Sequence, residues 1–233
     1  MRQVSDDMIL NAWERGVSEH QLDRALTLLM LAHSDVSRSD LASLSIADRD
    51  KRLFELTGRM FGPSLDLAAI CPECDAETAL AFDVAAAAGV SSTIDADRYV
   101  QIGDQSVHYR LPNSHDLAHA LTIGSREKAR TTLLKSIVDH DDPPEALLQS
   151  VDRDLRENAG LEVLTIGHAC TECGHEQTTA FDIVDYLWRH VVAYGHRLMF
   201  DIHQLAQAYG WLTADILALS PARRAAHIAM VSR

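Results

Sequence analysis

Apolar residues recur at helical spacing over most of this 233-residue chain. The longest such pattern, over 183–209, has apolar residues at positions 184, 187, 188, 191, 194, 198, 202, 205 and 209, close to the 3.6-residue period of an α-helix. Shorter patterns of the same kind predict helices over 4–16, 22–32, 46–61, 125–139, 143–158 and 213–219. A last helix is expected from Ser220, because Pro221 suits a first helical position. The chain is therefore expected to be mainly helical.

Polar residues predict where two of these segments begin. Ser18 and Gln21 have the spacing of a capping box before the helix 22–32. Ser114, two positions after Pro112, fits the N-cap of another helix. The polar stretch 34–45 reads as a loop, and Gly62-Pro63 is expected to end the helix 46–61.

A smaller part of the chain alternates as β-strands do. Short strands are expected over 65–70, 78–84 and 161–169. The segment 97–111 alternates on either side of Gly103-Asp104 and predicts a β-hairpin. The predicted fold class is α+β, mainly α-helical, with a small β-hairpin sheet.

One cysteine-bearing phrase occurs twice. Residues 69–84 read AICPECDAETALAFDV, and residues 168–183 read HACTECGHEQTTAFDI. An ungapped alignment of Cys71–Val84 with Cys170–Ile183 gives identity at seven of fourteen positions: both cysteines, the glutamates at 73/172 and 77/176, and the Ala-Phe-Asp ending. The repeat predicts two copies of a strand–turn–strand knuckle, with Phe82 and Phe181 packed beneath the knuckles.

The chain has four cysteines, and the two CxxC pairs use all of them. Structural Zn²⁺ takes four tetrahedral ligands, and one CxxC turn supplies two. The sequence therefore predicts one structural Zn²⁺ held by Cys71, Cys74, Cys170 and Cys173 as a composite zinc ribbon, each knuckle giving half of the site. The 95 residues between the pairs are then an insertion.

Other chemistry is less well supported by the residues. A thiol-based redox pair, or a redox-gated holdase, is an alternative use of the CxxC motifs, and so is an iron–sulfur or redox-switched site. His168 and His175 flank the second knuckle and are alternatives as substitute ligands, but we expect surface histidines because the first copy has no matching histidine. His196 and His203, seven residues apart with Asp201 nearby, lack any known metal-binding pattern. No nucleophile-elbow, phosphate-loop or dinucleotide motif occurs, and we expect no enzyme activity.

Net charge narrows the choice of partner. The chain carries 21 Lys and Arg against 34 Asp and Glu, a net charge of -13. This balance argues against a zinc-ribbon nucleic-acid module and against binding to anionic membranes, because both require a positive face. The N-terminal segment lacks the features of a signal peptide, and no apolar run is long enough for a membrane span. We therefore expect a cytoplasmic protein.

These patterns divide the chain into five parts. The expected order is an N-terminal helical region (1–64), a first zinc knuckle (65–84), an inserted hairpin with helices (85–160), a second zinc knuckle (161–183) and C-terminal helices (184–233). One compact domain is expected to contain all five.

Six phrases together resemble a known family. They are LDRALTLLMLA (22–32), ADRDKRLFELTGRMFGPSL (47–65), ICPECDAE (70–77), YRLPNSHDL (109–117), ACTECGHEQTTAFDIVDYLW (169–188) and IHQLAQAYGWLTADILALSPARRAAHIAMV (202–231). In this order they resemble the zinc-knuckle baseplate hub assembly chaperones, of the T-even phage type, that are encoded with phage-tail-like contractile injection systems. The resemblance implies a factor that helps baseplate, hub or spike proteins assemble and that catalyses no reaction. His227 departs from the pattern, which has a bulky residue there, so looser packing is expected at that position.

A binding protein of this kind needs an exposed apolar or aromatic surface. The segment after the longest helix offers one. We predict a partner-binding region made of Tyr209, Trp211, Ile216, Leu217, Arg223 and Arg224. The alternative is that these residues only pack the terminal helices together.

Overall fold

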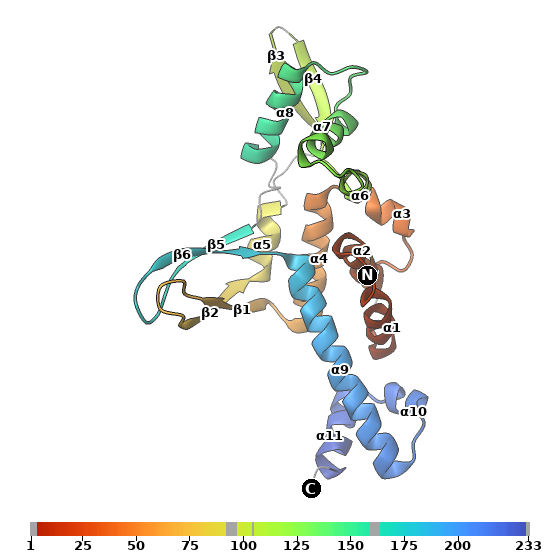
Figure 1. Ribbon diagram of the computed structural model, residues 1–233. Helices are drawn as coiled ribbons and strands as arrows, with labels where there is room; N and C mark the ends of the chain where they lie inside the picture. The colour runs from red at the N-terminus through yellow and green to blue at the C-terminus, as the bar shows by residue number, and fades with distance from the viewer. Residues whose placement is uncertain (1–3, 92–96, 104, 159–163, 232–233) are drawn as a thin grey trace. The chain divides into compact units, whose positions relative to one another are not determined.

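The computed structural model describes residues 4–91, 97–103, 105–158 and 164–231 (Figure 1). The chain divides into two compact units. Unit 1 combines Met1–Ser34 with Asp185–Arg233, and unit 2 is Asp35–Val184. The structure is mixed α and β and mostly helical, as predicted, and each of its sheets has two antiparallel strands. The expectation that all parts form one compact domain stays a prediction.

The described residues of unit 1 form helices joined by short connections. Its helices are α1 (Asp6–Gly16), α2 (Gln21–Ala32), α9 (Ile183–Tyr209), α10 (Thr213–Ala218) and α11 (Pro221–Val231). The long α9 spans the segment that its apolar period predicted. Its residues Leu198, Ile202 and Leu205 form a core with Leu10 of α1 and Ile216 of α10. Within the described residues, no helix has both the length and the apolar character needed to cross a membrane.

Two contacts fix how α1 and α2 pack on α9 within unit 1. A Cβ atom added to Gly16 would lie 2.4 Å from the Trp188 ring, so only glycine allows this close approach. The Arg24 guanidinium of α2 lies 4.9 Å from the centre of the same ring, and its Nε donates a hydrogen bond to the Gly16 carbonyl at 2.8 Å. A cation over an aromatic face is attracted to the ring's negative face.

The start of α2 differs from the prediction. The N-cap is His20, whose Nδ1 accepts a hydrogen bond from the Leu22 amide, and the expected Ser18–Gln21 box is not the cap. Histidine is an uncommon N-cap, and its ring nitrogen here replaces the usual side-chain oxygen.

Unit 2 begins with two helices, α3 (Arg38–Ala42) and α4 (Ile46–Phe61). The prediction for α4 was right, including its end at Gly62, whose φ of +104° suits glycine. The helix α3 lies in the segment predicted to be a loop. Ser37 caps it by accepting a hydrogen bond from the Asp40 amide, and Leu41 is fully buried. One turn of helix was too short to show a period in a serine-rich stretch.

The two cysteine phrases fold as two antiparallel hairpins. The first pairs β1 (Ser64–Ile70) with β2 (Glu77–Asp83), and the second pairs β5 (Leu164–Ala169) with β6 (Glu176–Phe181). The predicted strand began at 161, but 161–163 lie outside the described residues. An unpredicted helix, α5 (Val84–Ser91), follows β2 directly. Its alanine-rich sequence has high helix propensity but no amphipathic period, which is why the pattern missed it.

The inserted segment has its own core. It comprises β3 (Asp97–Ile102), β4 (Gln105–Arg110), α6 (Ser114–Leu121), α7 (Arg126–Ile137) and α8 (Glu145–Asn158). The β3–β4 hairpin was predicted, and Gly103 turns between its strands with a φ of +60°. Tyr109 and Val151 are fully buried in this core.

The N-cap of α6 is Asn113, and not Ser114 as predicted. The Asn113 side chain accepts from the Asp116 amide, and the Asp116 carboxylate accepts from the Asn113 amide, so a capping box forms. The same carboxylate receives two hydrogen bonds from Arg110 at 2.6 and 2.8 Å. The pair therefore ties the end of β4 to the start of α6.

Candidate metal centre

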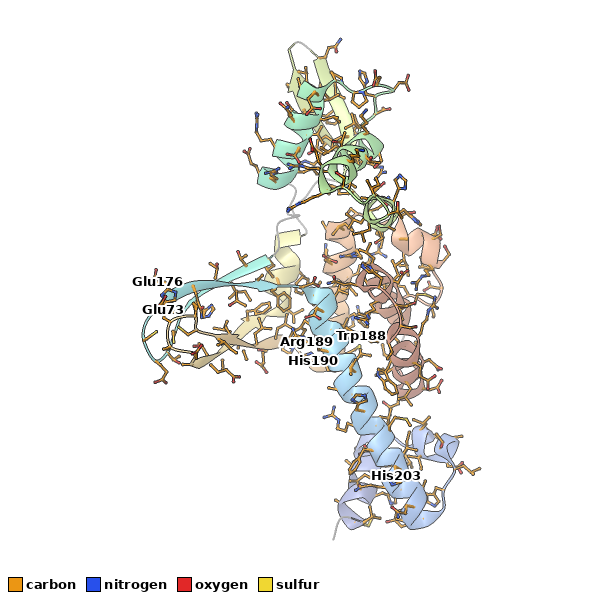
Figure 2. The ribbon with its side chains drawn as sticks, viewed as in Figure 1. Glu73, Glu176, Trp188, Arg189, His190 and His203 are labelled. Atoms are coloured by element: carbon orange, nitrogen blue, oxygen red, sulfur yellow. The ribbon has the colours of Figure 1, made fainter. Side chains whose placement is uncertain are left out.

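The four cysteines converge between the turns of the two hairpins. One sulfur from each lies within 4.8 Å of all the others. Cys71 Sγ is 3.6 Å from Cys173 Sγ, and Cys74 Sγ is 3.7 Å from Cys170 Sγ. Figure 2 labels Glu73 in one cysteine turn and Glu176 at the end of the other. The prediction that both knuckles contribute to one cluster is confirmed.

The spacing of the sulfurs fits a tetrahedral ion. Four ligands placed 2.3 Å from a central Zn²⁺ would lie about 3.8 Å from one another. The two short sulfur distances lie close to this edge length, and no two of the four sulfurs are more than 4.8 Å apart. The cluster is therefore compatible with a metal site made of thiolates alone.

Both turns use the same backbone geometry. The first cysteine amide donates to the carbonyl five residues on, Cys71 to Ala76 and Cys170 to His175, each at 2.9 Å. The equivalent residues Asp75 and Gly174 adopt positive φ values of 55° and 73°. Aspartate and glycine are among the residues that tolerate this left-handed conformation. The repeat in sequence is thus a repeat in structure.

Each turn buries one sulfur ligand and exposes the other. Cys71 and Cys170 are buried, at 0% and 3% exposure, whereas Cys74 and Cys173 face solvent. Amide hydrogen bonds from Cys173 and Glu172 lower the pKa of Cys170 to about 6. The Ala76 amide lowers the pKa of Cys74, but the Cys173 sulfur, burial and the other two sulfurs outweigh it and raise that pKa to about 12. Four adjacent thiols thus resist losing all their protons unless a cation is present.

The repeated phenylalanines lie away from the sulfurs. Phe82 pairs with Leu65 and Phe181 with Leu164, at the strand ends opposite the cysteine turns. The two rings pack edge to face with centroids 5.0 Å apart, and Phe181 also stacks on Phe54 of α4 at 5.9 Å. The two rings therefore pack at the base of the hairpins and not directly under the sulfurs, because five strand pairs separate each ring from its cysteine turn.

The repeated aspartates cap two helices, a role that was not predicted. Asp83 Oδ1 accepts hydrogen bonds from the Ala85 and Ala86 amides, and Asp182 Oδ1 accepts from the Val184 amide. Each aspartate therefore ends a hairpin and starts a helix, α5 or α9. An aspartate before an apolar run is a known N-cap signal and could have indicated this.

The four histidines considered as ligands are not part of the cluster. His168 Nε2 lies 2.9 Å from Gln177 Nε2, and its Nδ1 lies 3.3 Å from the Ile166 carbonyl. His175 contributes its carbonyl to the second turn. In unit 1, His196 packs edge to face on Trp13, and His203 is exposed on α9 (Figure 2). Among the described residues, the four cysteines form the one group of three or more potential ligands close enough to share a metal ion.

The predicted partner-binding residues divide into exposed and buried ones. Tyr209 is 40% exposed and stacks on the half-buried Trp211 at 4.7 Å, Leu217 is half-buried and Arg223 is exposed. Ile216 is fully buried and Arg224 is 4% exposed, so the structure places these two in the core, against the prediction of a surface role.

Arg224 is buried because it has charged partners within unit 1. Its guanidinium contacts Asp6 at 2.5 Å and Asp201 at 3.4 Å, and the Tyr194 hydroxyl donates to Asp6 at 2.6 Å.

His227 packs edge to face on Trp211, with ring centroids 4.9 Å apart. The residue that departs from the family pattern therefore belongs to the same aromatic group as Tyr209 and Trp211.

Comparisons with protein-family models, with curated proteins and with solved structures found no match to this chain.

Proposed function

We propose that the protein is a non-catalytic assembly factor for the baseplate or hub of a phage-tail-like contractile injection system. It acts by binding partner proteins, on a scaffold that one structural Zn²⁺ holds together. The sequence resemblance supports the choice of machine. The proposed zinc scaffold is supported by one observation, namely that the sulfur atoms of all four cysteines lie within 4.8 Å of one another.

A closed ligand set favours a structural metal over a catalytic one. Catalytic zinc sites keep a coordination position for water or substrate, whereas structural sites fill all four with protein ligands. Here Cys71, Cys74, Cys170 and Cys173 fill the set. An ion at this point would join two hairpins that come from distant parts of the chain, and its binding free energy would add to the stability of the fold.

The aromatic pair Tyr209 and Trp211 of unit 1, of which Tyr209 is exposed and Trp211 half-buried, supplies the proposed contact with a partner. Tyr209 and Trp211 stack where α9 ends, and Leu212, beside them in the chain, is 70% exposed. Tyrosine and tryptophan bury large areas at little entropic cost, which is why they are enriched at binding hot spots. Arg223 adds an exposed cation to the same region. The core residues Ile216 and Arg224 have the role of supporting this surface from within.

A redox function of the cysteines is the second candidate. The low pKa of Cys170 favours it, because a thiolate is the reactive form of cysteine. Cys170 is nevertheless buried, which limits attack on it. Measurement of metal content and of thiol alkylation separates the two functions. Tightly bound zinc with unreactive thiols would support the structural-metal proposal, whereas metal-free protein with a rapidly alkylated Cys170 would support the redox function.

Tagged protein recovered from the native host, with its partners read by mass spectrometry, tests the assembly function. Recovery of baseplate, hub or spike subunits without sheath and tube is the expected result. Trp211→Ala should reduce that recovery at least tenfold, while the exposed Tyr99→Ala of unit 2 should leave it unchanged. Recovery of whole particles would indicate a structural component, and absence of all tail proteins would overturn the proposal.

A further inference from the structure

A groove between α4 and α5 in unit 2 has no role in the metal centre. Its volume is about 530 Å³, and its lining includes the small apolar residues Gly58, Val84, Ala85 and Ala88. This volume lies in the range of binding sites for ligands and peptide side chains. The groove arises because the two helices approach closely at Gly58, where an added Cβ would meet Val84 Cγ1 at 3.2 Å. Small side chains on α5 then leave the space beside this contact unfilled.

The rim of the groove is charged in a regular order. Lys51, Glu55 and Arg59 follow one another at four-residue intervals along α4, so they lie on one side of the helix. With a rise of 1.5 Å per residue, the two cations are about 12 Å apart and the glutamate lies about midway. No ion pair joins any of the three to another residue of the described chain. This local excess of positive charge occurs in a chain whose net charge is -13.

We propose that this groove binds a helical segment of a partner protein that is acidic at two points two turns apart. The segment has an acidic residue opposite Lys51, a neutral or basic residue opposite Glu55, and an acidic residue opposite Arg59. Small or medium apolar side chains between them contact Ala85 and Ala88. An amphipathic helix in an apolar groove is an established mode of recognition, and the charge order gives it a direction and a register.

Charge complementarity favours this occupant over an anionic lipid surface. Membrane binding by electrostatics requires several adjacent Lys or Arg residues. Here Glu55 lies between the two cations and would repel a uniformly anionic surface. A helix can instead offer a different charge at each turn.

The proposal is independent of the assembly function, because it concerns unit 2 and the proposed aromatic contact concerns unit 1. A photo-crosslinking side chain, p-benzoylphenylalanine, is placed at Ala85 in the full-length protein in its host. The matched control carries the same group at Ala86, which is exposed on the same helix and does not line the groove. Metal content and thermal unfolding establish that each variant is folded, and mass spectrometry identifies the cross-linked peptide.

The expected result is one protein segment with the stated acid–neutral–acid order, captured from Ala85 and not from Ala86. Combining Lys51→Glu with Arg59→Glu should lower the yield at least fivefold, and changing the two acids of the captured segment to lysine should restore it. Lys135→Glu, an exposed charge reversal elsewhere in unit 2, should have no effect. A captured segment without the acid pair, a cross-link to lipid, equal yields from Ala85 and Ala86, or no capture would overturn the proposal. An acidic segment from a protein unrelated to phage tails would support the groove and contradict the assembly function.

Discussion

The sulfur atoms of Cys71 and Cys173 lie 3.6 Å apart, although 102 positions separate the two residues in the chain. Cys74 and Cys170 approach in the same crossed manner, so the first cysteine of each hairpin faces the second cysteine of the other. Neither hairpin can therefore complete a four-sulfur set alone. Closing so long a loop is entropically costly, and a shared ion would offset this cost.

Cys71→Ser and Cys173→Ser should have the same effect, because each removes one ligand from one shared ion. We predict that either change lowers bound metal from one atom per chain to almost none and lowers the temperature of unfolding by a similar amount. Metal analysis and thermal unfolding check this, with the exposed Thr171→Ser as control. Independent losses of half the metal from each variant would show two separate sites.

Gly16→Ala should destabilise unit 1 even though it adds one methyl group. The new Cβ would lie 2.4 Å from the Trp188 ring, which is also fixed by Arg24, so the helices must move apart. Overpacking of this kind costs about 1–3 kcal/mol. Chemical denaturation measures the change in the free energy of unfolding. Gly124→Ala, where a Cβ meets nothing within 4 Å, is the control, and equal effects of both changes would disprove the packing argument.

Arg224 and Arg223 are neighbours with opposite expected behaviour. Arg224→Ala leaves Asp6, whose side chain is only 12% exposed, without its cation, and breaking a largely buried pair in this way costs about 3–5 kcal/mol. Arg223→Ala removes an exposed side chain and should change the free energy of unfolding by less than about 0.5 kcal/mol. Denaturation of both variants separates the two roles. A stable Arg224→Ala protein that loses its partner would restore the original surface assignment.

Asp116 should give unit 2 a pH-dependent stability. Burial raises the pKa of Asp116, but the Arg110 guanidinium, the Asn113 amide and the Ser136 hydroxyl outweigh burial and lower it below its ordinary value of 3.8. Because the folded-state pKa is lowered, the stabilisation is fully present above the unfolded pKa and is lost as pH falls through the folded pKa.

Asp116→Asn should therefore lower the free energy of unfolding by about 1–3 kcal/mol at pH 7, and the difference should shrink as the pH falls below about 4. Denaturation at a series of pH values measures it. Asp141→Asn, in the exposed acidic turn before α8, is the control. A difference that stays constant down to pH 2 would show that the ion pair is not its source.

The sequence predicted those parts of the structure that a repeated motif, an apolar period or a turn residue marks clearly. The repeated CxxC phrase predicted the four-cysteine cluster because one tetrahedral ion needs the two cysteines of each copy. This requirement holds for any fold of the residues between the copies. The apolar period predicted α9, and turn residues predicted the β3–β4 hairpin. The alanine-rich α5 was missed, because its burial depends on Gly58 of α4 and not on a period of its own.

The burial of a charged residue was also mispredicted from the sequence. Arg224 looks like a surface residue in sequence, and only its neighbours Asp6 and Asp201, from distant parts of the chain, make its burial tolerable. The N-caps at His20 and Asn113 were also mispredicted. Several polar residues near each helix start could have served as the cap, and the sequence does not show which one does. The burial of a charge and the choice of an N-cap are decided by tertiary packing and not by the spacing of residues in the sequence.

Native mass spectrometry of the unaltered, reduced protein tests the central claim most directly. If two hairpins share one ion, the folded chain should carry the added mass of one zinc atom, with four protons displaced from the four thiols. A second bound ion, a metal-free chain in zinc-containing buffer, or a mass showing disulfides in freshly reduced protein would contradict the shared-metal account.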